Sequence, residues 1–428
     1  MVRCHLLNGS FREIDAADLK EIAGVVERNR QALYDLKLEV IIRLLTRLGR
    51  SIIQDAALCA IDGVSYISLW LRKDNLDKIC RLNYLDATYF EAFKKTESRF
   101  ELCAQPRGIV CHWIANNVPT LAFFSVVLSV LSRNGSLVKV PEQHLHILVG
   151  ILKHLSEIEV ESGGKTYAGK DIVDAIAIVS FDGQNPEESR IFSWLADCKI
   201  IWGGSEAVQA VTALPQKDHC EIIAFGPKYS FGVFDRAFIE SEAFADALKK
   251  TVQDVAVFNQ TACSSPQVLF FEKSKFSIHE IADRVKRCFE TLPGRFLKQP
   301  VSQTIAAQII NARGMYLLDE TKDILKSDDL SWTILIDQNV SLEEPVQGKT
   351  IFLKEVDQVD RVLGLITRKI QAMTVCISDP VARREFAKQA TYRGVDRVVV
   401  PQKIHDFDLP WDGMLILNRL VRWVMLKS

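Results

Sequence analysis

The sequence lacks several features that would mark it as a member of particular protein classes. Its 428 residues contain 53 Lys and Arg against 54 Asp and Glu, so the formal charge is −1 and neither sign dominates. A nucleic-acid or membrane-surface partner therefore has no general electrostatic support. The most apolar run, residues 118–131, is shorter than the roughly 20 residues of a membrane-spanning helix. We expect this run to form a buried helix, and we expect no membrane span and no nucleic-acid partner.

Cysteine pairs of the metal-binding kind are absent as well. The ten cysteines are scattered without a C-x-x-C pair, and the eight histidines are not spaced to complete a zinc set. The first residues contain no uninterrupted apolar segment of the kind that signal peptides carry. We therefore expect free thiols, no metal and a cytoplasmic protein.

Glycine-rich phosphate signatures are also missing. Gly164, Lys165 and Thr166 look like the end of a phosphate loop, but Glu159 stands where the first glycine of G-x-x-x-x-G-K-[ST] belongs. No G-x-G-x-x-G follows a candidate strand. These departures exclude a P-loop ATPase and the standard dinucleotide fingerprint, and they predict that the Gly-Lys-Thr sequence is a surface turn.

The sequence does contain a regular alternation of short apolar strands and helices. Residues 16–49 and 84–101 have the mixed three- and four-residue apolar spacing of helices. The alternation begins after residue 105 and predicts βαβ units and parallel sheets. The length predicts two lobes. The expected strands are 107–115, 136–140, 172–181, 198–202, 332–336, 350–354, 374–378 and 397–400, and the expected helices are 120–132, 142–157, 186–196, 205–213, 240–256 and 277–291.

A tight glycine turn follows the strand at 198–202. Gly203, Gly204 and Ser205 lead from this strand into a helix. The backbone N–H groups at such a helix start can bind an anion such as pyrophosphate. The alternative is a plain helix cap with Ser205 as the capping residue.

Two other short segments are candidates for catalysis. Cys263 lies in a small polar segment, whereas most other cysteines lie in apolar or helical runs. An accessible thiol with a lowered pKa is a nucleophile, and the alternative is a small apolar residue. Asn116 and Asn117 follow the strand at 107–115. A side-chain amide there can donate to a developing oxyanion, and the alternative is the usual role of asparagine in a turn.

Taken in their order along the chain, these segments resemble the aldehyde dehydrogenase superfamily and, more narrowly, the LuxC-type acyl-CoA reductases. The resemblance runs from about residue 106 to residue 413. It is carried by P-R-G-I-V-C-H-W-I-A-N-N-V-P, R-N-G-S-L-V-K-V, W-G-G-S-E, N-Q-T-A-C-S-S-P-Q and the closing L-P-W-D-G-M.

The resemblance implies a role for five residues. Cys263 would be the nucleophile, and Asn117 would donate to the oxyanion together with the backbone N–H of Cys263. Lys139 would contact the adenosine ribose of the cofactor, and Gly204 and Ser205 would lie at its pyrophosphate. The implied cofactor is NADPH. NADH is the alternative, because one lysine near the ribose can serve either cofactor.

The sequence departs from hydrolytic aldehyde dehydrogenases at one position. Their E-L-G-G-K segment supplies a glutamate that activates water, whereas this chain has A-F-G-P-K with Ala224 at that position. Alanine cannot act as a base, so the resemblance implies that the acyl-cysteine is released by reduction. A second superfamily glutamate, which positions the nicotinamide ribose, would correspond to Glu355. The alternatives are a hydrolytic aldehyde dehydrogenase, a weakly catalytic subunit that holds an acyl-transfer partner, and an unrelated α/β binding protein.

We therefore expect an α/β, aldehyde dehydrogenase-like fold with a Rossmann-type parallel-sheet cofactor lobe and an α/β catalytic lobe. Residues 1–228 would form the NAD(P)-binding lobe with a helical N-terminal region, residues 229–400 the catalytic lobe, and residues 401–428 a segment that packs back or oligomerises. The expected activity is NADPH-dependent reduction of an acyl thioester, a long-chain fatty acyl-CoA, to the aldehyde. The expected partners are an acyl-CoA or acyl-protein donor, an acyl-protein synthetase and further copies of the chain.

Overall fold

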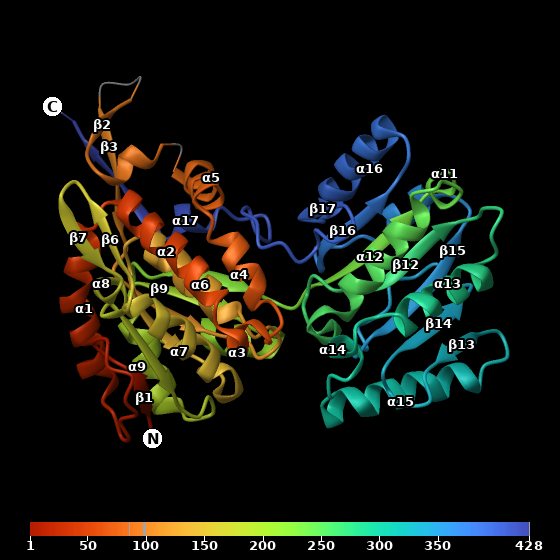
Figure 1. Cartoon of the computed structure of the whole chain (residues 1–428), viewed down its shortest axis with the longest axis horizontal. Coiled ribbons are helices and arrows are strands. Elements are labelled where there is room, and N and C mark those ends of the chain that lie inside the picture. The colour runs from red at the N-terminus through yellow and green to blue at the C-terminus, as the bar shows by residue number, and fades with distance from the viewer. Residues whose placement is uncertain (85, 97–99, 428) are drawn as a thin grey trace. The chain divides into compact units, whose positions relative to one another are not determined.

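The computed structural model describes residues 1–84, 86–96 and 100–427, and the chain forms two compact units (Figure 1). Unit 1 consists of Met1–Gly226 and Asp408–Ser428, and unit 2 consists of Pro227–Phe407. The C-terminal segment therefore belongs to the same unit as the N-terminal half of the chain.

Unit 1 is built on a six-stranded sheet in the order β1-β8-β5-β4-β9-β10. Five strands are parallel, and the N-terminal β1 is antiparallel to its neighbour β8. The short apolar sequences of β4, β8 and β9 are almost fully buried, as expected of parallel strands that are covered on both faces. The strands are β1 (Arg3–Leu6), β4 (Ile109–Trp113), β5 (Gly135–Lys139), β8 (Ile176–Ser180), β9 (Cys198–Trp202) and β10 (Glu221–Phe225).

Helices cover both faces of this sheet. The apolar side of α1 packs with α9 against one face, around Val26, Phe192 and Leu137. The fully buried α6 packs on the other face, beneath α7 and α2. The helices of unit 1 are α1 (Leu19–Asp35), α2 (Leu38–Ile52), α3 (Ala56–Cys59), α4 (Val64–Trp70), α5 (Lys73–Tyr84), η1 (Ala87–Phe90), α6 (Leu121–Leu131), α7 (Glu142–Ser156), α8 (Lys170–Val173), α9 (Pro186–Leu195), α10 (Ser205–Thr212) and α17 (Ile416–Arg419).

Two smaller sheets complete unit 1. One has the order β18-β3-β2, with β18 (Val421–Leu426) antiparallel to β3 (Glu101–Pro106), which also pairs with β2 (Lys94–Lys95). The other is the hairpin of β6 (Glu159–Ser162) and β7 (Lys165–Ala168). Gly163 and Gly164 form its two-residue turn with φ of 58° and 74°, a conformation that favours glycine. The Gly-Lys-Thr residues are exposed as predicted, but only Gly164 lies in the turn, whereas Lys165 and Thr166 begin β7.

Unit 2 is built on a seven-stranded sheet in the order β13-β14-β15-β12-β11-β16-β17. All neighbours are parallel except β13, which is antiparallel to β14. The strands are β11 (Tyr229–Phe234), β12 (Pro266–Glu272), β13 (Asp323–Lys326), β14 (Thr333–Asp337), β15 (Thr350–Val356), β16 (Ile370–Cys376) and β17 (Arg397–Val399).

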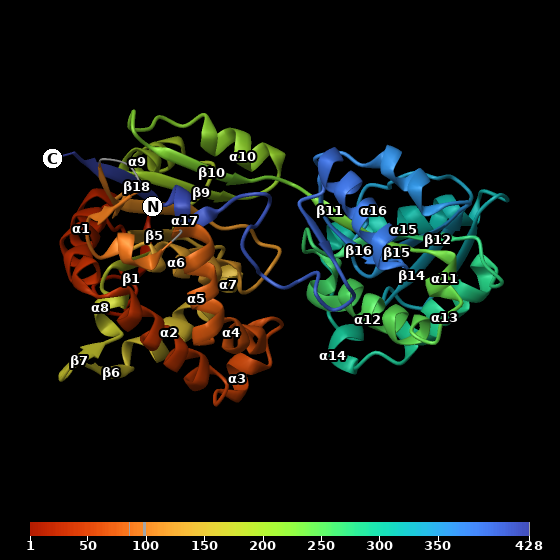
Figure 2. The same cartoon turned by 90° about the horizontal axis from the view of Figure 1, so that it is seen from above.

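Two apolar cores enclose this second sheet. One contains Phe244, Ile281 and Phe296 from α12, α13 and α14, and the other contains Tyr316 from α15 and Phe386 from α16. Figure 2 shows α12, α13 and α14 on one side of the strands and α16 on the other. The helices of unit 2 are α11 (Arg236–Ile239), α12 (Phe244–Ala256), η2 (Val257–Gln260), α13 (Ile278–Glu290), α14 (Gly294–Leu297), α15 (Gln303–Leu317), η3 (Val359–Leu365) and α16 (Pro380–Arg393).

The expected α/β fold with parallel sheets is confirmed, and three local expectations need correction. Residues 16–49 are not one helical run, because Leu36 and Lys37 are extended and separate α1 from α2. The strand expected at 172–181 begins only at Ile176, since α8 occupies the preceding residues. The single helix expected at 84–101 is wrong, because among the described residues only Tyr84 at the end of α5 and the short 3-10 helix η1 are helical there, while β2 and the first residue of β3 are extended. Residues 85 and 97–99 lie outside the described residues.

Among the described residues, no helix is both long and apolar enough to cross a membrane. The apolar run at 118–131 forms α6, which is buried inside unit 1.

His112 in the middle of β4 makes stability depend on pH. Its Nδ1 atom lies 2.8 Å from the Ser125 hydroxyl, and burial lowers its pKa from 6.5 to about 3. The folded state therefore holds a neutral ring. The contribution of this ring to the free energy of unfolding is complete above pH 6.5 and is lost as the pH falls toward 3. Between pH 7.5 and pH 5.5 we expect this histidine alone to remove about 1.4 kcal/mol from the free energy of unfolding.

Urea unfolding at the two pH values, followed by tryptophan emission, measures this loss, since every tryptophan except Trp332 belongs to unit 1. His112→Gln should have a correspondingly weaker pH dependence, while the exposed His146→Gln should behave like the parent chain. An unchanged pH dependence in His112→Gln would contradict the assignment.

Candidate active site

A pocket of about 740 Å³ lies in unit 1 beyond the carboxyl ends of four parallel strands. The chain places β4, β5 and β8 in one direction across the sheet and then returns to place β9 and β10 on the other side of β4. Such a reversal leaves a crevice where open α/β sheets bind their ligands. The last residue of each adjoining strand lines it, namely Trp113, Lys139, Ser180 and Trp202.

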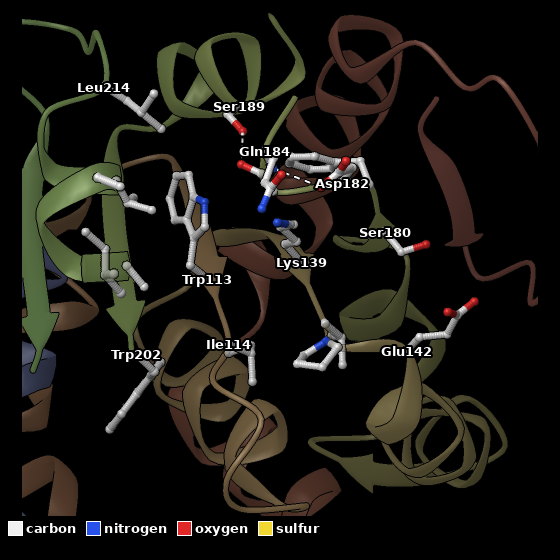
Figure 3. A pocket seen from close by; sticks show the side chains of 18 of the residues that line it. Trp113, Ile114, Lys139, Glu142, Ser180, Asp182, Gln184, Ser189, Trp202 and Leu214 are labelled. Carbon is white, nitrogen blue, oxygen red and sulfur yellow. Dashed lines mark hydrogen bonds between the residues drawn. The ribbon is translucent and has the colours of Figure 1, made fainter. Parts of the chain in front are cut away.

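Lys139 brings a positive charge into this pocket. Its Nζ atom lies 4.5 Å from the centre of the Phe181 ring, and Figure 3 shows the ammonium group directed toward the loop that carries Asp182 and Gln184. Burial lowers the pKa of Lys139, while the charges of Asp182 and Glu188 oppose that shift. A partly desolvated cation is a strong partner for an anionic ligand group.

The pocket has one apolar wall and one polar wall. Ala207, Ala210 and Val211 of α10 form the apolar wall together with Leu214. The polar wall contains Lys139, Asp182 and Gln184, and also Arg3, which donates to Glu142 at 2.7 Å. This combination suits a ligand with both a flat apolar part and a charged part.

The glycine turn lies beside the apolar wall, at the start of α10. Gly204 is the N-cap of this helix and Ser205 is its first residue, with no side-chain cap hydrogen bond. The alternative in which Ser205 caps the helix is therefore wrong. Both residues are exposed, and a Cβ atom at Gly204 would meet nothing within 4 Å. A ligand can thus approach the backbone N–H groups of the turn closely.

Asn117 lies in the loop between β4 and α6 and is partly buried. Its neighbour Asn116 is exposed and holds the loop to α7, since Gln143 donates to its side-chain oxygen and His144 Nε2 lies 3.4 Å from its carbonyl oxygen. Two further residues considered in the sequence are placed in strands: Ala224 in β10 and Glu355 in β15, both partly buried.

The two tryptophans of the pocket were not foreseen in the sequence. Trp202 stacks on Phe225 with ring centres 3.8 Å apart and donates to Ser125 at 3.1 Å. Trp113 packs edge-on against Phe192, 4.8 Å away. Each tryptophan is the last residue of a buried strand, and this is the only signal for them in the sequence. Because core residues also occupy such positions, the signal does not identify a pocket. Asp182 and Gln184 follow the last residue of β8 and were missed for lack of any motif.

Cys263 lies in unit 2, on a turn that leads into the central strand β12. The N–H of Ser265 donates to the carbonyl of Ala262 at 2.9 Å, which closes the turn around Cys263 and Ser264. Cys263 is partly exposed. The Ser230 hydroxyl donates to the carbonyl oxygen of Cys263 at 2.9 Å. Burial raises the pKa of many other cysteine thiols, namely Cys4, Cys80, Cys111, Cys198, Cys220, Cys288 and Cys376.

The segment before this turn has an unusual backbone. Phe258, Asn259 and Gln260 have φ of 54°, 53° and 62°, so three consecutive non-glycine residues are left-handed. Each such residue costs about 1–3 kcal/mol and persists only when its surroundings fix it. Strained backbone of this kind clusters at functional sites, and here it ends three residues before the candidate nucleophile Cys263.

The Gln260 side chain fixes this left-handed segment. Its Nε2 atom donates to the carbonyls of Pro266 at 2.9 Å and Thr350 at 2.8 Å, and its Oε1 atom accepts from the N–H of Thr350 at 2.8 Å. The segment is thereby tied to the first residues of β12 and β15.

A second left-handed segment packs against the first. Residues 347–349 have φ of 67°, 59° and 60°. Gly348 donates its N–H to the Asn259 carbonyl at 3.1 Å, and the buried Lys349 ammonium donates to the Asn259 side chain. The two segments thus hold each other.

The fold around these features is that of an aldehyde dehydrogenase. The solved structure of aldehyde dehydrogenase C from Pseudomonas syringae, in complex with NAD⁺ and octanal, superposes with a TM-score of 0.68. The match covers 100% of this chain and 93% of that chain at 12% identity, which shows the shared fold alone.

The sequence then fixes the family. The model of the acyl-CoA reductase (LuxC) family matches residues 14–423, and the chain belongs to this family, as its motifs predicted. The long-chain acyl-protein thioester reductase of Aliivibrio fischeri is 22% identical over 329 residues, which are 75% of this chain and 64% of that protein. The protein of the same name from Photorhabdus laumondii is 23% identical over 348 residues, 79% of this chain and 65% of that protein. The chain thus matches less than two thirds of the length of these curated relatives.

Replacing Gln260 tests whether its side chain stabilises the left-handed segment. Gln260→Ala removes three hydrogen bonds to backbone groups, each of which contributes about 1 kcal/mol, so we expect the free energy of unfolding to fall by about 3 kcal/mol. Urea unfolding followed by far-ultraviolet circular dichroism measures the change. The exposed Gln308→Ala in α15 is the control and should change stability by less than about 0.5 kcal/mol. Equal stability of the two variants would show that the segment does not need Gln260.

Proposed function

We propose that the chain reduces a long-chain acyl thioester to the aldehyde with NADPH, through a covalent intermediate on Cys263. The observation that carries this proposal is the fixed, partly exposed turn that presents Cys263 in a chain of the LuxC family. A preorganised nucleophile loses little entropy when it reacts, which is the advantage of such a fixed turn.

The chemistry assigned to Cys263 is acyl transfer. The Cys263 thiol gives up its proton and its sulfur bonds to the carbonyl carbon of the thioester. The bond to the donor sulfur breaks, and the donor takes up a proton and leaves as a thiol. The Asn117 amide and the backbone N–H of Cys263 would donate to the oxygen that becomes negative, and such donors contribute about 3–4 kcal/mol each in the transition state. Bound NADPH supplies the hydride. The hydride adds to the acyl carbon, the bond from that carbon to the Cys263 sulfur breaks, and a proton taken up from solvent restores the thiol as the aldehyde leaves.

The pocket of unit 1 fits such a dinucleotide. Its volume of about 740 Å³ and its apolar α10 wall suit the adenine ring. Lys139 would hold the adenosine ribose and its phosphate, and the open turn at Gly204 and Ser205 would hold the pyrophosphate. The aldehyde dehydrogenase of Pseudomonas syringae was solved with NAD⁺, which supports a nucleotide of this type.

The names of the relatives bear on which molecule carries the acyl group as a thioester. Both curated relatives are named for acyl-protein thioesters, which favours an acylated protein over the acyl-CoA expected from the sequence. A hydrolytic aldehyde dehydrogenase is disfavoured by Ala224, which offers no base in β10.

Cofactor binding is testable without turnover. Trp113 and Trp202 line the pocket, so NADPH should change tryptophan emission on titration. Lys139→Ala should raise the Kd for NADPH by about 10- to 100-fold, because it removes a charge-assisted contact of about 1.5–3 kcal/mol. Lys165→Ala, on the exposed β7 outside the pocket, is the control. Unchanged NADPH affinity in Lys139→Ala would remove Lys139 from the cofactor site.

Intact-protein mass spectrometry tests the proposed intermediate. After mixing with a long-chain acyl-CoA or a long-chain acyl-protein, we expect a mass gain of one acyl group that is lost, with release of aldehyde, when NADPH is added. Cys263→Ala should abolish the gain, whereas Cys288→Ala, another partly buried thiol of unit 2, should keep it.

The other outcomes separate the alternatives. Decay of the adduct to free acid without NADPH would favour a hydrolytic aldehyde dehydrogenase. No adduct from either donor would overturn the proposed reaction and leave a weakly catalytic subunit as the better description.

A further inference from the structure

A hydrogen-bonded chain of side chains begins at the residue after Cys263. The Ser264 hydroxyl lies 2.9 Å from Nδ1 of His405. Nε2 of the same ring lies 2.7 Å from the carbonyl oxygen of Asp254 in the last turn of α12. Ser264 is almost fully buried, so its hydroxyl is directed to the ring and not to solvent.

The acceptors fix where the protons lie. A carbonyl oxygen can only accept, so the His405 Nε2 atom carries a proton and donates it to Asp254. In the neutral ring Nδ1 then accepts, and the Ser264 hydroxyl must donate. Burial lowers the pKa of His405 to about 4, with a smaller lowering by Arg397, so the ring is neutral near pH 7. The direction of every hydrogen bond in the chain is therefore determined.

The rest of the surroundings hold the ring in place. The Phe258 ring meets His405 edge-on at 5.6 Å, and Phe258 begins the left-handed segment before Cys263. The side chain of Asp254 accepts a hydrogen bond from the N–H of Gln402 at 2.8 Å. Burial, together with the nearby Asp406, raises the pKa of Asp254 to about 7. Arg397, Asp254 and Asp406 are the charged groups that the cited interactions place around the ring.

The turn is thus held at two adjacent residues. Ser230 donates to the carbonyl oxygen of Cys263 at 2.9 Å and itself accepts from the N–H of Ala372 at 3.2 Å. His405 holds Ser264, the next residue. Two anchors from different elements fix the peptide between Cys263 and Ser264, which sets the direction of the Cys263 side chain.

We propose that Ser264 and His405 are positioning residues for Cys263, with the Ser264–His405–Asp254 chain fixing the turn from which the thiol reacts. This inference rests on the proposed function of Cys263 as the nucleophile. Both residues act through the same hydrogen bond, so their removal should have the same effect and the double variant should be no worse than either single variant.

The test measures the pH dependence of Cys263 alkylation by iodoacetamide in the full chain, read from the mass of the Cys263 peptide. We expect the fixed turn to hold the Cys263 thiolate where N–H groups of the turn stabilise it, and we expect a released turn to lose this stabilisation. In Ser264→Ala, His405→Ala and the double variant we expect the midpoint of the alkylation profile to rise by a similar amount, about one pH unit. Ser264→Thr keeps the hydroxyl and should restore the parent profile. The controls are Ser274→Ala and His279→Ala, which change a serine and a histidine of unit 2 that do not hydrogen-bond to Ser264, His405 or Asp254.

Turnover supplies a second readout. With a long-chain acyl thioester and NADPH, kcat should fall by about 10- to 100-fold in both single variants with little change in KM, because the proposed contact from the Cys263 N–H is made to charge that develops in the transition state. An unchanged alkylation midpoint in Ser264→Ala, or effects that add in the double variant, would overturn the proposal. If His405→Ala does not fold, Ser264→Ala against Ser264→Thr decides alone. If the parent chain forms no acyl-enzyme, the proposed function fails, while the alkylation profiles still decide whether the pair positions Cys263.

Discussion

Hydrogen bonds from the side chain of Gln260 stabilise the left-handed segment 258–260, together with the contacts that Asn259 makes to residues 348 and 349. The amide of Gln260 joins the first residues of β12 and β15, which are neighbouring central strands of the second sheet. These hydrogen bonds connect the segment before Cys263 to the sheet, so the sheet fixes the position of the Cys263 turn. A sheet moves less than a surface loop. The second left-handed segment, the Ser230 hydroxyl and the Ser264–His405 pair hold the same region through separate hydrogen bonds.

The two candidate sites of the chain arise by different physical means. The pocket of unit 1 follows from topology, since the reversal of strand order at β4 opens a crevice whatever side chains line it. The Cys263 turn follows from local backbone strain that particular side chains compensate. Substitutions at the pocket should therefore change what binds with little effect on folding, whereas substitutions around the turn should change stability and reactivity together.

Much of the first unit could be predicted from the sequence, because its signals are local. Short apolar runs identified β4, β5 and β9, and the order of the motifs identified the family. The contacts that complete the Cys263 turn could not be predicted in this way. Ser264 and His405 are 141 residues apart, and nothing near either residue indicates the other. The antiparallel β1 at the sheet edge was missed as well, since four residues beside a turn carry too little pattern to identify a strand.

The connectivity of the chain makes unit 2 an insertion within unit 1. Unit 2 is one continuous stretch, whereas unit 1 is closed by β18, which pairs with β3 across more than three hundred residues. The Leu420 carbonyl accepts from the Asn134 side chain at 3.0 Å, and Asn83 accepts from the N–H of Leu417 at 3.0 Å. During synthesis on the ribosome the inserted unit can therefore fold as soon as it emerges, while the unit that began first is completed last. A chain interrupted within the final segment would have a complete inserted unit, but β3 would lack its partner strand β18. Such an unpaired strand edge is a site for chaperone binding or for aggregation.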